Sequence, residues 1–203
     1  MTNFTFLKGA SEADELVERA QELGYAALAI ADECSMAGIV RAHVAAKKAG
    51  LPLLVGAHFA VQPRTERDGP FTLVVLAQNL EGYGNLCQFI TRLRRASAKG
   101  EYHLDTAGLQ HGELKHCLAL LCPDRSCTDA QLDTVGRWAL THFTGRCWIG
   151  VDLVRRIDDE LWLHRMRALS SLTEVPLVAV GDVHMHVRSR KPLQDVLTAA
   201  RIG

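Results

Sequence analysis

The chain has 203 residues, a length that suits one compact domain able to bury most of its apolar surface. Hydrophobic residues make up 48% and charged residues 23%, an ordinary globular composition. Lys and Arg equal Asp and Glu in number, and this formal net charge of +0 argues against a domain that holds nucleic acid through bulk positive charge. No apolar run reaches the roughly 20 residues that a membrane-spanning helix needs.

The compartment expected from the sequence is the cytoplasm. The first residues lack the charged and apolar halves of a signal peptide. The six cysteines are scattered through the chain, which indicates reduced, partly buried thiols. We therefore expect a cytoplasmic protein without a membrane partner.

Apolar runs typical of strands alternate with amphipathic stretches typical of helices. A first helix is expected from Ser11, as a potential N-cap, to Gly24, and a second from Ser35 to Gly50. A buried strand over 25–31 lies between them. The remaining strands are expected over 51–61, 71–77, 117–121, 147–151 and 175–180, and the remaining helices over 83–98, 128–143 and 158–172.

This alternation predicts the α/β class, with a mainly parallel sheet covered on both faces. With about seven such units, a barrel is favoured over an open sheet. The polar stretches 62–70 and 99–115 are predicted to be loops, and neither has the composition of a domain boundary. We therefore expect residues 1–203 to form a single domain.

The sharpest chemical signal follows the last predicted strand. Asp182, His184 and His186 alternate in sequence, so an extended backbone would place all three on one face. Carboxylate and imidazole are good ligands for zinc, manganese or iron, and α/β folds place their sites at the carboxyl ends of strands. The alternative is a polar strand end that hydrogen-bonds to neighbouring loops.

Two other predicted strands end in similar groups. Asp32 and Glu33 follow the strand over 25–31, and His58 lies in the strand over 51–61. Asp32 could instead cap the following helix together with Ser35, and His58 could be a hydrogen-bonded core histidine. The convergence of three strand ends favours a shared site. Arg188 and Arg190, with Lys191, lie just beyond the histidines and are candidate phosphate-binding residues.

Several segments together resemble the PHP (polymerase and histidinol phosphatase) domain of bacterial error-prone DNA polymerases, which are C-family enzymes of the DNA polymerase III alpha type. The segments that carry this resemblance are Asn3–Ser11, Ala27–Ser35, Ala37–His43, Leu76–Asn79, Gly82–Leu86, Gly181–Arg190 and Pro192–Thr198. The resemblance implies a distorted (β/α)7 TIM-like barrel with up to three metal ions at the carboxyl ends of its strands. The first family motif, a His-x-His on the first strand, does not occur here, so we expect the barrel to lack that strand.

The resemblance also implies a ligand set. Asp182 and His184 match the last metal motif of the family, and Asp32 and Glu33 match its second motif. His58 stands where the family usually has an acidic residue, a change that alters the charge and the metal preference of the site. A divalent metal (Zn, Mn or Fe) is thus possible, although the missing first motif removes ligands.

Three functional hypotheses follow from the resemblance. The first is a PHP domain of a damage-induced, translesion polymerase, with a vestigial or structural metal site and no polymerase activity of its own. The second is an active metal-dependent phosphoesterase or 3′–5′ exonuclease. The third is a non-catalytic interaction module. The partners implied are the remainder of the polymerase chain, DNA through the parent polymerase, and accessory mutagenesis proteins.

Overall fold

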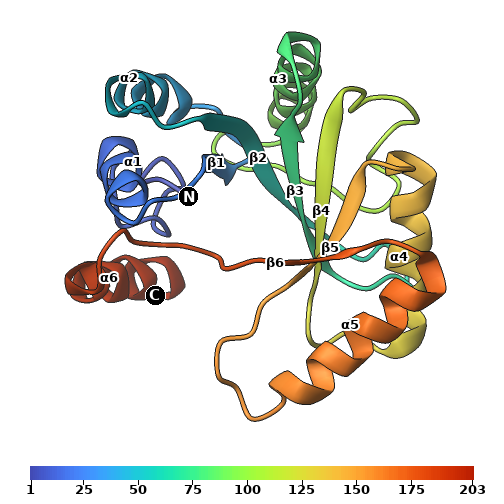
Figure 1. The fold of residues 1–203 in the computed structure, drawn as a ribbon. Coiled ribbons are helices and arrows are strands. Elements are labelled where there is room, and N and C mark those ends of the chain that lie inside the picture. Colours follow the sequence, from blue (N-terminus) through green and yellow to red (C-terminus); the bar gives the residue numbers. More distant parts are fainter. The chain divides into compact units, whose positions relative to one another are not determined.

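The computed structural model describes all 203 residues, and the chain divides into two compact units. Unit 1 comprises Met1–His58 together with Asp182–Gly203, and unit 2 comprises Phe59–Gly181. Figure 1 labels the helices and strands of both. None of the helices combines the length and the hydrophobicity that a bilayer crossing requires.

Unit 1 is built around two parallel strands and a pair of helices. Strand β1 pairs with β2 from Leu28 opposite Leu53 to Glu33 opposite His58. Helices α1 and α2 pack against each other and bury small and branched side chains, including Val17, with Ile30 of β1. The elements of this unit are α1 Ala13–Glu22, β1 Leu28–Glu33, α2 Ile39–Ala49, β2 Leu53–Val61 (which continues into unit 2), the 3₁₀ turn η1 Arg188–Arg190, and α6 Lys191–Ile202.

The starts of α1 and α2 differ from the prediction. Ser11 does not cap α1, because its hydroxyl is bonded to His186 instead, and a capping box between Glu12 and Glu15 begins the helix. Helix α2 begins at Ile39, later than predicted. The residues before it form a tight turn, in which Cys34 has a φ of 45°. Ser35 therefore belongs to this turn and not to the helix.

Unit 2 holds four strands in the order β3-β4-β5-β6, with three helices packed against them. Helix α3 packs on β3 and β4, whereas α4 and α5 contact each other and the strands from β4 to β6. The strands are β3 Phe71–Ala77, β4 Cys117–Pro123, β5 Cys147–Val151 and β6 Leu177–Ala179, and the helices are α3 Leu80–Arg95, α4 Asp129–Phe143 and α5 Asp159–Thr173.

One strand pair in unit 2 is antiparallel. The β4–β5 and β5–β6 pairs are parallel, as expected of strands joined by a crossover helix, but β3 and β4 run in opposite directions, from Phe71 opposite Pro123 to Ala77 opposite Cys117. The long connection 96–116 lies between α3 and β4. This connection lets the chain enter β4 from the end at which β3 finishes.

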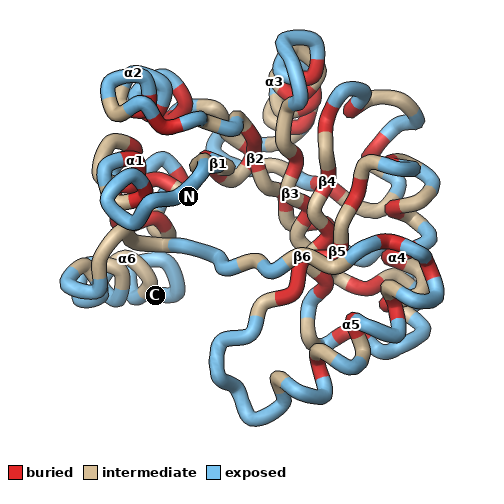
Figure 2. Tube along the Cα trace, viewed as in Figure 1, coloured by how far each residue is buried: buried red, intermediate tan, exposed pale blue.

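Aromatic side chains form much of the core of unit 2. Phe59 and Phe89 are fully buried and meet edge to face, with ring centroids 5.1 Å apart. Phe71 packs against Trp138, with ring centroids 5.0 Å apart. Buried and intermediate segments alternate along β3 and β4 in Figure 2, as expected of strands with one face in the core.

The α/β class is confirmed, and several predicted boundaries agree with the structure. Strands β3 and β5 have the predicted bounds, and Thr128 caps α4 in a capping box with Gln131. The stretches 62–70 and 99–115 are loops, as predicted. The last strand is shorter than predicted, because β6 covers residues 177–179 alone.

Two glycines of α3 provide a matched test of this packing. A Cβ on Gly82 would lie 2.0 Å from the backbone oxygen of His116, whereas a Cβ on Gly84 meets nothing within 4 Å. We expect Gly82→Ala to lower the free energy of unfolding by about 1–3 kcal/mol. Gly84→Ala should raise it by about 0.5–1 kcal/mol, because alanine favours helix. Urea unfolding measures both, and equal effects would contradict the close approach of α3 to His116.

Candidate functional site

The six predicted metal ligands all belong to unit 1. They come from the end of β1, from β2 and from the segment 182–186. The N-terminal segment 1–11 supplies most of the groups that contact them. The residues are Asp32, Glu33, His58, Asp182, His184 and His186.

Asp32 is buried, and both of its carboxylate oxygens accept hydrogen bonds. Its Oδ1 accepts the backbone N–H of Thr2 at 2.6 Å and the hydroxyl of Thr5 at 2.8 Å, and its Oδ2 accepts the hydroxyl of Thr2 at 2.7 Å. Only 1% of the residue is exposed. A buried carboxylate requires such bonds to offset the loss of its hydration. Asp32 therefore ties the N-terminal segment to β1.

Glu33, the neighbour of Asp32, forms an ion pair with Lys8. The Lys8 Nζ lies 2.5 Å from a carboxylate oxygen of Glu33, and both side chains are mostly shielded from solvent. The backbone N–H of Glu33 donates to the hydroxyl of Thr5. Both acidic residues at the end of β1 thus have partners in the same short segment.

His58 has the orientation typical of a histidine metal ligand. Its Nδ1 lies 2.8 Å from the carbonyl oxygen of Ala31, to which it donates a proton, so Nε2 carries a lone pair. A histidine ligand usually donates its other ring N–H in this way. Burial lowers the pKa of His58 below its ordinary value, which keeps the imidazole neutral near pH 7.

Asp182 and His184 form an ion pair with each other. Oδ2 of Asp182 lies 2.8 Å from Nε2 of His184. This hydrogen bond is the main cause of a lowered pKa of Asp182 and a raised pKa of His184. The carbonyl oxygen of His184 accepts the N–H of Ala10, which attaches this segment to residues 1–11.

His186 lies in a separate network. Its Nδ1 is 2.7 Å from the hydroxyl of Ser11 and 3.7 Å from the carboxylate of Glu15. Glu15 also binds the guanidinium of Arg190. The backbone after Ala179 is no longer a strand, so strict alternation does not govern the segment, and His186 faces α1. Of the two predicted phosphate-binding residues, Arg190 is thus engaged by Glu15, and Arg188 lies in η1.

The residues present do not fit a metal ion in this arrangement. No three His, Cys, Asp or Glu side chains of the chain lie together as a group that could hold one. Asp32 and Glu33 are engaged by Thr2, Thr5 and Lys8. We therefore derive no reaction step through a metal.

Sequence reasoning did not identify Thr2, Thr5, Lys8 and Ser11 as parts of this site. All four lie in the segment 1–11, and Thr2, Thr5 and Ser11 are almost completely buried. The only signal in the sequence was their chemistry, because hydroxyl and ammonium groups can donate hydrogen bonds to buried acceptors.

Comparison with known proteins identifies the family. The family model of the PHP domain matches residues 1–146. This chain belongs to the PHP domain family. It is 49% identical over 203 residues to the error-prone DNA polymerase of Methylococcus capsulatus and 48% identical over 212 residues to that of Ralstonia nicotianae. The alignments cover the whole chain but 18% and 20% of those proteins, so the PHP chain spans about a fifth of the length of these relatives.

Solved structures show the same fold at low sequence identity. A protein from Bifidobacterium adolescentis assigned as a metal-dependent phosphoesterase matches with a TM-score of 0.62 at 16% identity, over 87% of this chain and 84% of that one. An amidohydrolase from Chromobacterium violaceum, with bound sulfate and no metal, matches with a TM-score of 0.59 at 16% identity, over 88% and 84%. The α/β fold predicted for a PHP domain is thereby confirmed.

Removing the carboxylate of Asp32 should destabilise the PHP domain strongly. Asp32→Ala leaves three buried donors of Thr2 and Thr5 without an acceptor, and we expect the free energy of unfolding to fall by about 3–5 kcal/mol. Asp32→Asn keeps one acceptor oxygen, so its free energy of unfolding should fall by less. The control Glu22→Ala removes a surface ion pair with Arg19 and should change stability by less than about 0.5 kcal/mol in denaturant unfolding. Equal losses in Asp32→Ala and the control would contradict this role.

The Asp182–His184 pair should contribute stability that depends on pH. Because the pKa of His184 is raised above 6.5, its contribution is complete below pH 6.5 and is lost as the pH rises through the raised pKa. Because the pKa of Asp182 is lowered below 3.8, its contribution holds above pH 3.8 and is lost as the pH falls through the lowered pKa.

The wild type should therefore be more stable to unfolding than His184→Gln between about pH 4 and pH 6.5, and this difference in stability should be smaller at pH 9. The difference should stay below about 1 kcal/mol, because the Asp182 side chain is 74% exposed. Thermal unfolding across this pH range measures it. A difference that does not vary with pH would exclude the ion pair as its source.

Proposed function

We propose that this chain is a non-catalytic, structural PHP domain of an error-prone, translesion DNA polymerase, in which the residues of an ancestral metal site now hold the domain together. The observation that carries this proposal is the engagement of both oxygens of Asp32, whose carboxylate accepts three hydrogen bonds from Thr2 and Thr5. A metal ion at Asp32 would compete with those bonds, and any buried donor that it displaced would lose its acceptor.

The remaining candidate ligands support the same conclusion. Lys8 neutralises Glu33, and the positive charge of Lys8 opposes a cation at the same carboxylate. His186 is bonded to Ser11 on the side of α1. Each contact joins the N-terminal segment or α1 to a part of the chain that is distant in sequence. In this proposal the acidic and histidine side chains act as structural cross-links.

A metal-dependent phosphoesterase or 3′–5′ exonuclease is the second candidate function. One observation favours it: His58 donates Nδ1–H to Ala31 and leaves Nε2 free, as a histidine ligand does. The relative from Bifidobacterium adolescentis is assigned as a metal-dependent phosphoesterase, which gives this candidate a precedent on the same fold. Such activity would require Asp32 and Glu33 to exchange their present partners for a metal.

The partner that we propose is the remainder of an error-prone polymerase chain. The relatives named error-prone DNA polymerase are about five times as long as the part that this chain matches. DNA would be contacted through that polymerase, and accessory mutagenesis proteins through the same assembly. We propose the cytoplasm as the compartment, since none of the six cysteines forms a disulfide.

Metal content and turnover together test the proposed function. The protein is freed of chelator, dialysed against zinc, manganese or iron, and analysed for bound metal, beside a His58→Ala/His184→Ala variant. We expect well under one equivalent of metal in both proteins and no hydrolysis of bis-p-nitrophenyl phosphate or of a single-stranded oligonucleotide above background. One or more equivalents that disappear in the variant, together with turnover, would reject the structural role in favour of the phosphoesterase.

A further inference from the structure

An exposed apolar patch lies on the connection between β5 and α5. We call residues 152–158 the β5–α5 loop, and we define the apolar patch as Leu153, Val154, Ile157 and the neighbouring Leu161 of α5. All four side chains are at least half exposed, and Ile157 is fully exposed. Figure 2 draws most of the loop as exposed. Several exposed apolar side chains within one short stretch, 153–161, are a mark of a candidate interaction surface.

The loop is anchored by one buried cation. Arg125, whose side chain is 13% exposed, donates to the carbonyl oxygen of Asp152 at 2.7 Å and to the carboxylates of Asp159 at 2.7 Å and Asp158 at 3.2 Å. Its guanidinium also stacks over the ring of Trp162 at 5.3 Å. Both ends of the loop are therefore tied to the same side chain.

Ile157, at the start of α5, does not make the apolar contact that is common for a residue just before a helix N-cap. Ile157 directly precedes the N-cap Asp158, a position that commonly packs against the fourth residue of the helix, here Trp162. Trp162 is instead buried beneath the guanidinium groups of Arg125 and Arg165. Ile157 thus points into solvent although a buried ring lies one turn away in sequence.

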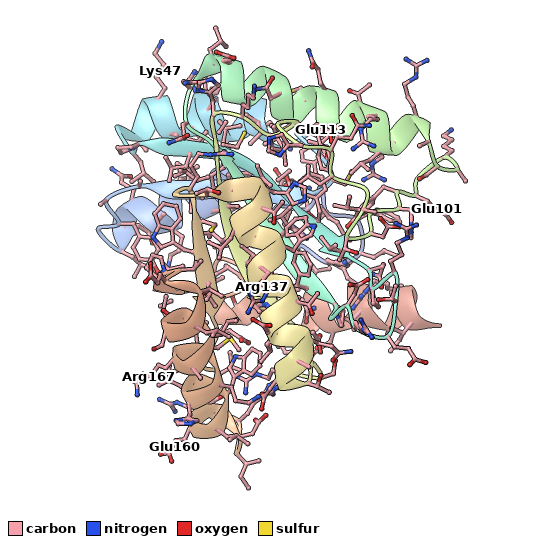
Figure 3. The ribbon with its side chains drawn as sticks, turned by 90° about the vertical axis from the view of Figure 1, so that its right-hand side faces the viewer. Lys47, Glu101, Glu113, Arg137, Glu160 and Arg167 are labelled. Atoms are coloured by element: carbon pink, nitrogen blue, oxygen red, sulfur yellow. The ribbon has the colours of Figure 1, made fainter.

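Charge adds a second feature to the patch. Arg155 and Arg156 stand between its apolar residues. Arg156 interacts electrostatically with Asp124, and the nearby acids Asp158 and Asp159 are paired with Arg125. Glu160 projects outward at the start of α5, as Figure 3 shows. A surface that complements the loop would be apolar at its centre, with carboxylates placed to meet the two arginines.

We propose that the apolar patch, with Arg155 and Arg156, docks on the remaining part of an error-prone polymerase chain, against an apolar groove bordered by Asp or Glu. This inference rests on one part of the proposed function, that the chain belongs to an error-prone polymerase. It does not require the PHP domain to be non-catalytic. About four-fifths of the length of the relatives lies outside the part that this chain matches. We expect that remaining part to provide the groove in which the apolar patch docks. The loop held by Arg125 would enter that interface with little loss of conformational entropy.

Hydrogen exchange in two contexts tests the docking. The full-length Methylococcus capsulatus polymerase is made with this chain in place of its matching residues, and its amide exchange over 152–158 is compared with that of the 203-residue chain alone. We expect exchange at least tenfold slower in the full-length protein. Val154→Asp/Ile157→Asp should abolish that protection and lower the melting temperature of the full-length protein, but leave that of the chain alone unchanged.

The matched control is Leu172→Asp, which changes a side chain of α5 that is exposed to a similar extent as Leu161. It should leave the protection of 152–158 unchanged. Equal exchange in both contexts would overturn the proposal. Protection that rises with the concentration of the chain alone would also overturn it, and would assign the patch to a second copy. Metal binding with turnover, seen together with protection of the loop, would reject the structural role and leave the docking intact.

Discussion

The carboxylate of Asp32 is the interaction on which the organisation of unit 1 depends. Removing a charged group from water costs several kcal/mol unless hydrogen bonds replace the lost hydration. Thr2 and Thr5 supply three such bonds, one of them from the backbone. Gly38, at the start of α2, lies so close that a Cβ there would be 2.7 Å from Oδ2 of Asp32. One buried group thus ties the N-terminal segment, the end of β1 and the approach to α2.

The structural role that we propose for this PHP domain rests on the same residues. Carboxylates and imidazoles at strand ends can bind a metal or can accept hydrogen bonds and ion pairs, and one lone pair cannot do both. Lys8 beside Glu33 and Ser11 beside His186 commit these groups to contacts within the protein. His58 has its Nδ1 bonded to Ala31 and His186 has its Nδ1 bonded to Ser11, so the Nε2 atom of each accepts no hydrogen bond.

Both units have an apolar core, and that of unit 2 is rich in aromatic side chains. Aromatic pairs such as Phe59 with Phe89 fill the space between β-strands and helices. Its charged side chains serve local purposes: Arg92 binds Glu113 beside α3, and Arg125 fixes the β5–α5 loop. The ion pairs of Arg125 fix the conformation of this loop, and its apolar side chains are exposed to solvent. The loop is therefore a preorganised surface.

Much of the fold could be predicted because its causes are local. The apolar runs of β3 and β5 and the Thr128 capping box are properties of neighbouring residues, and the structure has them at the predicted positions. The antiparallel β3–β4 pair was not predictable from that alternation, because the long connection after α3 permits either strand direction. The prediction that Ser11 caps a helix was wrong because the partner of its hydroxyl, His186, is 175 residues away in sequence.

The sequence by itself determined the α/β class, the family resemblance and the set of acidic and histidine residues at the strand ends. Residue type is enough to say which groups could bind a metal, but not which partners they meet. Only the tertiary structure decided that Thr2 and Thr5 donate to Asp32 across 30 and 27 residues of sequence. Hydrogen bonds depend on distance and direction in space, and folding sets both through the packing of segments that are remote along the chain.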